Sequence, residues 1–115
     1  MRIGELSRRT GLSASRIRFY EKRGLLPPPD RRENGYRDYP DSMVKRLGLI
    51  DGAQRLGFSL VEIHEALSDA APDFPTRAAM ASVLQAKLVS LDQHIREANA
   101  RRDQIVILLR EMGEG

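Results

Sequence analysis

Cysteine and tryptophan are both absent from this chain of 115 residues. Without thiols, the chain can form neither disulfides nor thiolate metal sites. It has no uncharged apolar run of about 18 residues and does not open with a secretory signal. We therefore expect no transmembrane helix and no contact with membranes, and we expect a cytoplasmic location.

The sequence also lacks the residue patterns of common enzymes. It has no evident nucleophile–base pairing, phosphate-binding loop or metal-ligand spacing. His64 and His94 are the two histidines, and scattered histidines of this kind are more often ordinary surface or core residues than metal ligands. We expect no enzyme activity, no cofactor and no metal site.

The charges are distributed unevenly along the chain. Residues 1–58 contain 13 Lys/Arg and 7 Asp/Glu, a net charge of +6, whereas residues 59–115 contain 6 and 9, a net charge of −3. The total of +3 is common among soluble proteins and says little by itself. A basic first half beside an acidic second half indicates that the first half binds a polyanion.

Residues 4–23 have the spacing of two short helices joined by a turn. Gly11 is placed to end the first helix, and Ser13 is a suitable N-cap for a second helix over about residues 14–23. Gly24 can close that helix in a left-handed conformation. This pattern predicts a helix-turn-helix.

The second of these helices has an apolar face and a basic face. At about 100° per residue, Ile17 and Tyr20 point to one side of the helix. The other side carries basic, aromatic and hydroxyl residues: Ser15, Arg16, Arg18, Phe19, Lys22 and Arg23. Such a face suits entry into the major groove, where arginines reach phosphates or guanine edges. A solvated surface is the alternative, with Phe19 packed beneath the following hairpin.

A β-hairpin is predicted over about residues 27–39. Three consecutive prolines from Pro27 cannot continue the helix, and Asn34-Gly35 can supply the positive φ angles of a tight turn. Basic and aromatic residues flank this turn: Arg31, Arg32, Tyr36, Arg37 and Tyr39. Helix and hairpin together predict a winged helix-turn-helix.

Two further helices complete a predicted first domain of residues 1–69. One begins at Asp41 or Ser42, and the other follows a capping box formed by Ser59 and Glu62. Residues 70–76, with two prolines, are predicted to be a linker.

One long helix is predicted over residues 77–112, which contain no proline or glycine. Its apolar residues recur at alternating steps of four and three, interrupted only by Arg102. This seam consists of Leu84, Leu88, Leu91, Ile95, Ala98, Ile105, Leu109 and Met112. A helix cannot cover its own seam, so the pattern predicts dimerisation; packing on the chain's own domain is the alternative.

Three segments, IRFYEKRGLL, RRENGYRDY and RLGFS, resemble in order and spacing the MerR family of bacterial transcription regulators. They look most similar to its copper-efflux regulator branch. The resemblance implies a mainly α-helical protein, with a winged helix-turn-helix followed by an antiparallel coiled-coil homodimer. It also implies binding to promoter DNA between the −35 and −10 elements, whose spacer is too long for RNA polymerase until the dimer bends and underwinds it.

The predicted DNA-binding residues combine the basic face, the hairpin and a later helix. The full set is Ser15, Arg16, Arg18, Phe19, Tyr20, Arg31, Arg32, Asn34, Tyr36, Arg37 and Arg55. The family positions favour four of them: Arg18, Tyr20, Tyr36 and Arg37. By the same resemblance, Gln54 stands where many relatives carry a phosphate-contacting arginine, and Arg55 is rotated from that position by about 100°.

The sensor end departs from the family. Metal-sensing members have a cysteine where this chain has Ala79 and a cysteine-bearing loop where it has only GEG. Thiolate sensing of copper, mercury, lead or cadmium and an iron–sulfur centre are therefore excluded. Constitutive binding stays open, and so does a small apolar effector where Leu60, Ile63 and Leu67 meet the partner's dimer helix near Leu84 and Leu88. Activation and repression also both stay open.

Two other functions stay open from the residues. One is an architectural, excisionase-like winged-helix protein that bends DNA without a transcriptional switch. The other is a helical adaptor that binds protein through its coiled coil. The long dimer seam favours the regulator over the excisionase-like protein.

Overall fold

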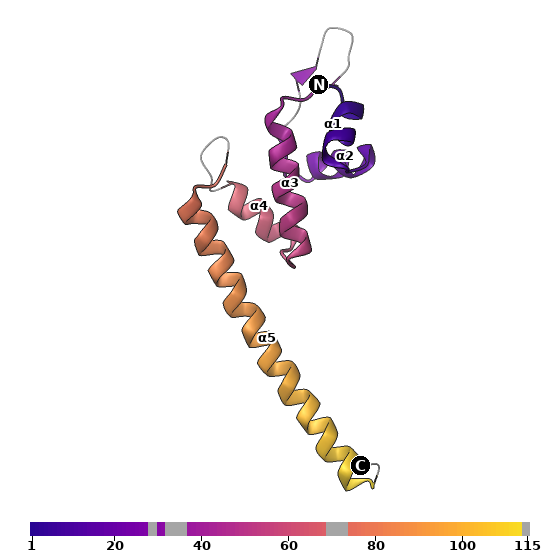
Figure 1. The fold of residues 1–115 in the computed structure, drawn as a ribbon, viewed down its shortest axis with the longest axis vertical. Helices are drawn as coiled ribbons and strands as arrows, with labels where there is room; N and C mark the ends of the chain where they lie inside the picture. The colour runs from indigo at the N-terminus through magenta and orange to yellow at the C-terminus, as the bar shows by residue number, and fades with distance from the viewer. Residues whose placement is uncertain (28–29, 32–36, 69–73, 114–115) are drawn as a thin grey trace. The chain divides into compact units, whose positions relative to one another are not determined.

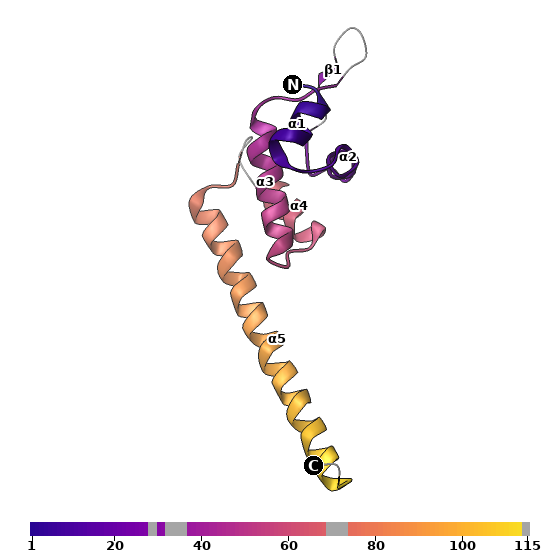
Figure 2. The ribbon, with the colours of Figure 1, turned by 45° about the vertical axis from the view of Figure 1, so that its right-hand side comes forward.

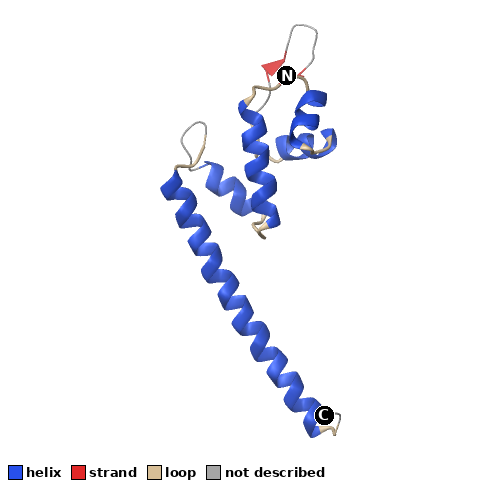
Figure 3. Ribbon diagram, in the orientation of Figure 1, coloured by secondary structure: helices blue, strands red, loops and turns tan. Residues whose placement is uncertain are grey.

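The computed structural model describes residues 1–27, 30–31, 37–68 and 74–113, and these are mainly α-helical (Figure 1 and Figure 3). The helices are α1 (Ile3–Thr10), α2 (Ala14–Lys22), α3 (Ser42–Arg55), α4 (Leu60–Ser68) and α5 (Arg77–Glu111). Two short strands, β1 (Asp30–Arg31) and β2 (Arg37–Asp38), lie between α2 and α3 in the chain. No helix within the described ranges is long and apolar enough to cross a membrane.

The chain divides into two compact units, Met1–Thr76 and Arg77–Gly115. In the first, α1 contacts both α2 and α3, and α3 contacts α4. These four helices form one cluster in both ribbon views (Figure 1 and Figure 2). Their core consists of Leu6, Ile17, Tyr20, Leu25, Leu26, Tyr39, Met43, Leu47, Ile50, Phe58, Ile63 and Leu67.

Side-chain caps fix where two of the helices begin. The Ser13 hydroxyl accepts a hydrogen bond from the Arg16 backbone N–H at 3.1 Å, as its position before α2 predicts. At α4, the Glu62 N–H donates to Ser59 Oγ at 3.1 Å, and the Ser59 N–H donates to Glu62 Oε1 at 2.9 Å. The predicted capping box is therefore present.

A left-handed glycine ends α2. Gly24 has φ of 77°, and its N–H donates to the Glu21 carbonyl at 3.1 Å. The next N–H, of Leu25, donates to the Tyr20 carbonyl at 3.0 Å. This pair of bonds is a Schellman motif, which turns the chain so that Leu25 enters the core.

The strands form a two-stranded antiparallel pair, with Asp30 opposite Asp38 and Arg31 opposite Arg37. The Met1 ammonium donates to the Tyr39 carbonyl at 2.6 Å and to Asp38 Oδ1 at 3.1 Å. The Tyr39 N–H donates back to the Met1 carbonyl at 2.7 Å. These contacts hold β2 next to the start of α1. The predicted turn at Asn34-Gly35 lies outside the described residues.

The second unit is built on α5, a helix of 35 residues with no buried side chain. Its seam residues Leu84, Leu88, Leu91, Ile95, Ala98, Ile105, Leu109 and Met112 are all exposed. Exposure along the seam's large apolar side chains ranges from 41% at Leu91 to 74% at Met112. The helix ends at Glu111, so Met112, predicted as its last residue, lies in the turn that follows.

Candidate nucleic-acid interface

The basic face of α2 is exposed, and its apolar face is anchored in the core. Ile17 and Tyr20 are 0% and 1% exposed, in agreement with the helical periodicity. Exposed on the other side are Ser15, Arg16, Arg18, Phe19, Lys22 and Arg23. Because the buried residues fix the rotation of the helix about its axis, the arginines are displayed in one direction.

Phe19 is a partly exposed aromatic residue among these arginines, at 41% exposure. The Arg23 guanidinium carbon lies 5.0 Å from the centre of its ring, within the range of a cation–π contact. The Phe19 and Tyr20 ring centroids are 5.9 Å apart and the rings are tilted. Phe19 thus connects the exposed arginines to the buried Tyr20.

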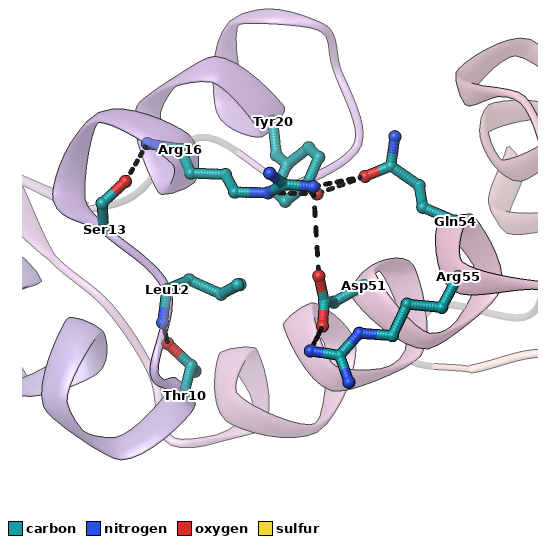
Figure 4. A network of polar contacts seen from close by, with 8 residues as sticks. All are labelled: Thr10, Leu12, Ser13, Arg16, Tyr20, Asp51, Gln54 and Arg55. Carbon is teal, nitrogen blue, oxygen red and sulfur yellow. Dashed lines mark hydrogen bonds and ion pairs between the residues drawn. The ribbon is translucent and has the colours of Figure 1, made fainter.

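Arg16 is held by one hydrogen bond within α2 and by another that crosses from α2 to α3 (Figure 4). Its Nε donates to Tyr20 Oη at 2.9 Å, and its Nη2 donates to Gln54 Oε1 at 3.1 Å. The Tyr20 hydroxyl also donates to Gln54 Oε1. The hydroxyl of Tyr20, a residue predicted to contact DNA, is therefore engaged within the protein.

Asp51 places a carboxylate beside the same arginine. Its Oδ2 lies 3.0 Å from Arg55 Nη2, and its Oδ1 lies 4.0 Å from Arg16 Nη2. Asp51 is 21% exposed as a side chain, whereas Arg55 is 79% exposed. Two of the predicted DNA-binding arginines therefore share one carboxylate. The i,i+4 spacing signals the Asp51–Arg55 pair in the sequence, but nothing local signals the contact with Arg16.

An open cavity of about 500 Å³ borders this network. It is lined by Ser13, Ser15, Arg16, Phe19, Tyr20, Gln54 and Leu60. The Ser13 and Ser15 hydroxyl oxygens are 3.2 Å apart and form a hydrogen bond. Hydroxyl, amide and guanidinium groups in one shallow hollow can meet the oxygens of a nucleic-acid backbone.

The remaining predicted site residues belong to the hairpin region. Arg31 and Arg37 are directly opposite each other in β1 and β2. Arg32, Asn34 and Tyr36 lie outside the described residues, so their predicted contacts with DNA stay predictions.

Arg46 is a partly buried arginine that no sequence pattern indicates as functional. Its Nε donates to the Leu25 carbonyl at 2.9 Å, and burial lowers the pKa of its guanidinium from the ordinary value. It ties α3 to the turn after α2 and so has a structural role.

Two family profiles match the chain. The MerR HTH family regulatory protein profile covers residues 1–70, and the profile named MerR, DNA binding covers residues 44–108. This chain belongs to the MerR family.

Individual relatives agree with this assignment. The HTH-type transcriptional regulator CueR of Salmonella typhimurium is 35% identical over 108 residues, which cover 94% of this chain and 78% of that protein. Among solved structures, the lead(II) complex of a transcription regulator from Ralstonia metallidurans CH34 is 28% identical with a TM-score of 0.76, over 96% of this chain and 85% of that one. HiNmlR, a MerR family regulator lacking the sensor domain, is bound to promoter DNA; it is 26% identical with a TM-score of 0.62, over 90% and 78%.

Membership confirms three expectations. The chain is a DNA-binding transcriptional regulator with a mainly helical, helix-turn-helix fold, and its family consists of regulators and not of enzymes. The likeness to CueR agrees with the resemblance to the copper-efflux regulator branch.

Proposed function

We propose that this regulator binds promoter DNA as a homodimer, with α2 of each subunit in the major groove. The observation that carries this proposal is the exposed basic face of α2, whose opposite face is fixed by the buried Ile17 and Tyr20. A helix held in this way can present Arg18 and Ser15 to base edges without losing much conformational freedom.

The strand pair completes the contact as a wing. Arg31 and Arg37 stand opposite each other in β1 and β2, where a β-hairpin can reach the backbone beside the groove. Arg32, Asn34 and Tyr36 lie between the strands in the chain and are proposed to extend this contact. Arg55, exposed at the end of α3, is proposed as a further phosphate contact.

Dimerisation is proposed to use α5 in an antiparallel coiled coil. The exposure of every seam residue supports this, because eight apolar side chains in one stripe need a covering surface. A second copy supplies an identical stripe, and closed two-fold pairing is the usual arrangement of homo-oligomers. Two α2 helices would then address two half-sites of one promoter.

The dimer is proposed to bend and underwind the spacer between the −35 and −10 elements, so that RNA polymerase can use the promoter. Bending a site of this size costs about 1–6 kcal/mol by elastic estimates. Phosphate contacts from two subunits must offset that cost. A protein with this function must reach promoters on the chromosome, so a cytoplasmic location is part of the proposal.

The effector is proposed to differ in chemistry from that of thiolate metal sensors. The printed sequence has no cysteine, and among its described residues no three His, Asp or Glu gather where they could hold a metal ion. An apolar effector where Leu60, Ile63 and Leu67 meet the partner's dimer helix stays a prediction, and Ile63 and Leu67 are 5% and 8% exposed in a single subunit. DNA binding without an effector is the other proposal.

Footprinting on the promoter upstream of the protein's own gene tests this function. We expect protection across an over-long spacer, hypersensitive positions at its centre, and altered transcription in a purified system with RNA polymerase. Bending without any change in transcription would favour the architectural protein. If each subunit neutralises about four phosphates, log K should fall with log salt with a slope near −7, and a slope shallower than about −3 would contradict the proposed contacts.

A further inference from the structure

A carboxylate close to a DNA-binding surface is costly, because it repels the phosphate backbone. Asp51 is such a carboxylate: it lies beside Arg16 of α2 and Arg55 of α3, both of which are proposed DNA contacts. The core does not need it, since it is partly exposed and belongs to none of the buried apolar positions. Its contacts are with the two arginines, which suggests a role in binding.

Arg16 is fixed from three directions. Tyr20 Oη accepts from its Nε, Gln54 Oε1 accepts from its Nη2, and Asp51 lies 4.0 Å from the same Nη2. The guanidinium carbon is also 5.5 Å from the centre of the Tyr20 ring. Figure 4 shows the guanidinium beside Tyr20 of its own helix, directed toward Gln54 of α3. A free arginine would sample many rotamers and could follow a phosphate at many positions on any duplex.

We propose that Asp51 and Gln54 are positioning residues that raise the discrimination of this regulator between its promoter and other DNA. Both residues hold Arg16 beside α3, and Asp51 also pairs with Arg55 within α3, so that each guanidinium contacts a phosphate only where the DNA path brings one to it. A non-specific duplex then gains less from these two charges, because they remain paired with Asp51. This inference rests on the proposed function.

The experiment compares two duplexes and two matched variants. The specific duplex is selected from a random library by the wild-type full-length protein, and the non-specific duplex is a scrambled sequence of equal length and composition. Asp51→Asn removes the carboxylate charge and keeps the side-chain shape. Asp41→Asn is the control: Asp41 is also within ion-pair distance of an arginine, with its Oδ1 3.4 Å from Arg9 Nη1, and its replacement changes the net charge equally.

For Asp51→Asn we expect the ratio of specific to non-specific affinity to fall about tenfold, the effect of losing one well-placed contact. Non-specific binding should tighten, and its salt slope should steepen by about one per subunit as the released arginines engage phosphates. Asp41→Asn should tighten binding to both duplexes alike and leave their ratio unchanged.

A double-mutant cycle tests whether Asp51 acts through Arg16. In the Arg16→Ala background, Asp51→Asn should lower the ratio by much less than it does in the wild type. Arg16→Lys is a second, independent variant at an exposed position: it keeps the charge but cannot bond Tyr20 and Gln54 together with one fork. It should lower the ratio without making the salt slope shallower.

Three outcomes would overturn the inference: an unchanged ratio in Asp51→Asn, an equal fall in Asp41→Asn, or additive effects in the cycle. If thermal unfolding shows that Asp51→Asn is misfolded, Arg16→Lys becomes the deciding variant. An unchanged ratio of specific to non-specific affinity in Arg16→Lys would also contradict the inference. If the wild-type protein itself shows no preference for any duplex in the selection, the proposed function fails. If it does show one, only the positioning role is at stake.

Discussion

The two units of this chain treat their apolar residues in opposite ways. The first unit, Met1–Thr76, buries side chains such as Leu6, Leu47 and Ile50 completely within a cluster of short helices. In the second unit, α5 has no buried side chain, although it carries a regular apolar stripe. The first unit therefore contains its own core, whereas α5 leaves its apolar stripe exposed.

This difference suits the two units to different roles: the first positions the DNA-binding face, and the second is proposed to pair with another copy. A self-contained unit can hold the basic face of α2 and its α3 network in place, because buried residues fix helix positions. In the proposed dimer a second copy covers the exposed seam of α5, so the stability of that helix should depend on protein concentration. Substitutions in the two units should therefore have different consequences.

Leu91→Asp should have the largest effect, since it places a charge near the middle of the proposed dimer seam. Burying an unpaired carboxylate costs several kcal/mol or more, and each dimer would contain two. We expect sedimentation to show monomers at micromolar concentration and promoter binding to lose its specificity, because a monomer covers one half-site.

Val89→Asp is the matched control for this substitution. Val89 lies on the same helix at 66% exposure, two residues before Leu91 and off the seam. This variant should remain a dimer. A wild-type protein that sediments as a monomer at micromolar concentration would overturn the comparison between the units, since the exposed stripe would then need another partner.

Leu47→Ala should destabilise the first unit and leave the dimer intact. Leu47 is 0% exposed in α3, and removing a fully buried leucine typically costs about 2–5 kcal/mol. For a unit of this size, each kcal/mol lowers the melting temperature by about 4–8 °C. Calorimetry should show the shift, while sedimentation at low temperature should still show a dimer.

Leu56→Ala serves as the control here, because Leu56 follows the same helix but is 58% exposed. Its melting temperature should change little. Equal shifts for both leucines would contradict the assignment of the core, and dissociation of Leu47→Ala into monomers would show that the two units are not independent.

Features set by neighbouring residues were predictable from the sequence. The Ser13 cap, the Ser59–Glu62 capping box and the left-handed Gly24 each depend on a few consecutive positions. The burial of Ile17 and Tyr20 followed from helical periodicity alone. In each case the residue types and their spacing contain the physical cause.

Contacts between helices were not predictable in the same way. Asp51 and Gln54 lie 35 and 38 positions after Arg16, and their meeting depends on how α2 packs relative to α3. Tyr20 is predicted to contact DNA, and in the structure its hydroxyl donates to Gln54 and accepts from Arg16. The contacts of Arg16 with Asp51 and Gln54 could not be predicted because these residues are far apart in the sequence, although their chemistry allows such contacts.

Arg18→Ala should weaken promoter binding by about 1–3 kcal/mol, the usual range for an arginine that contacts DNA. Arg18 is exposed on the basic face of α2, so the melting temperature of the free protein should not change. Fluorescence anisotropy with a labelled promoter duplex measures the affinity.

Arg110→Ala makes the same change of charge near the end of α5 and provides the control. It should alter binding only by the small, salt-screened effect of losing a charge that does not contact DNA. If Arg18→Ala binds promoter DNA as tightly as the wild type, α2 does not read the major groove. The assignment of DNA binding to the first unit through this helix would then be wrong.

Ser59→Ala should give the smallest effect, confined to the stability of the first unit. The Ser59 hydroxyl accepts the Glu62 N–H at the start of α4, and losing such a cap costs about 0.5–2 kcal/mol. Calorimetry should show a melting temperature lower by a few degrees, with an unchanged sedimentation coefficient.

Ser42→Ala tests the same chemical change at the first residue of α3, where the N-cap residue Asp41 makes no side-chain cap bond. It should shift stability by less than about 0.5 kcal/mol, as exposed substitutions usually do. If Ser59→Ala instead altered the dimer and left the first unit's melting unchanged, α4 would be stabilised by α5 or its partner, and the boundary between the two units would have to be redrawn.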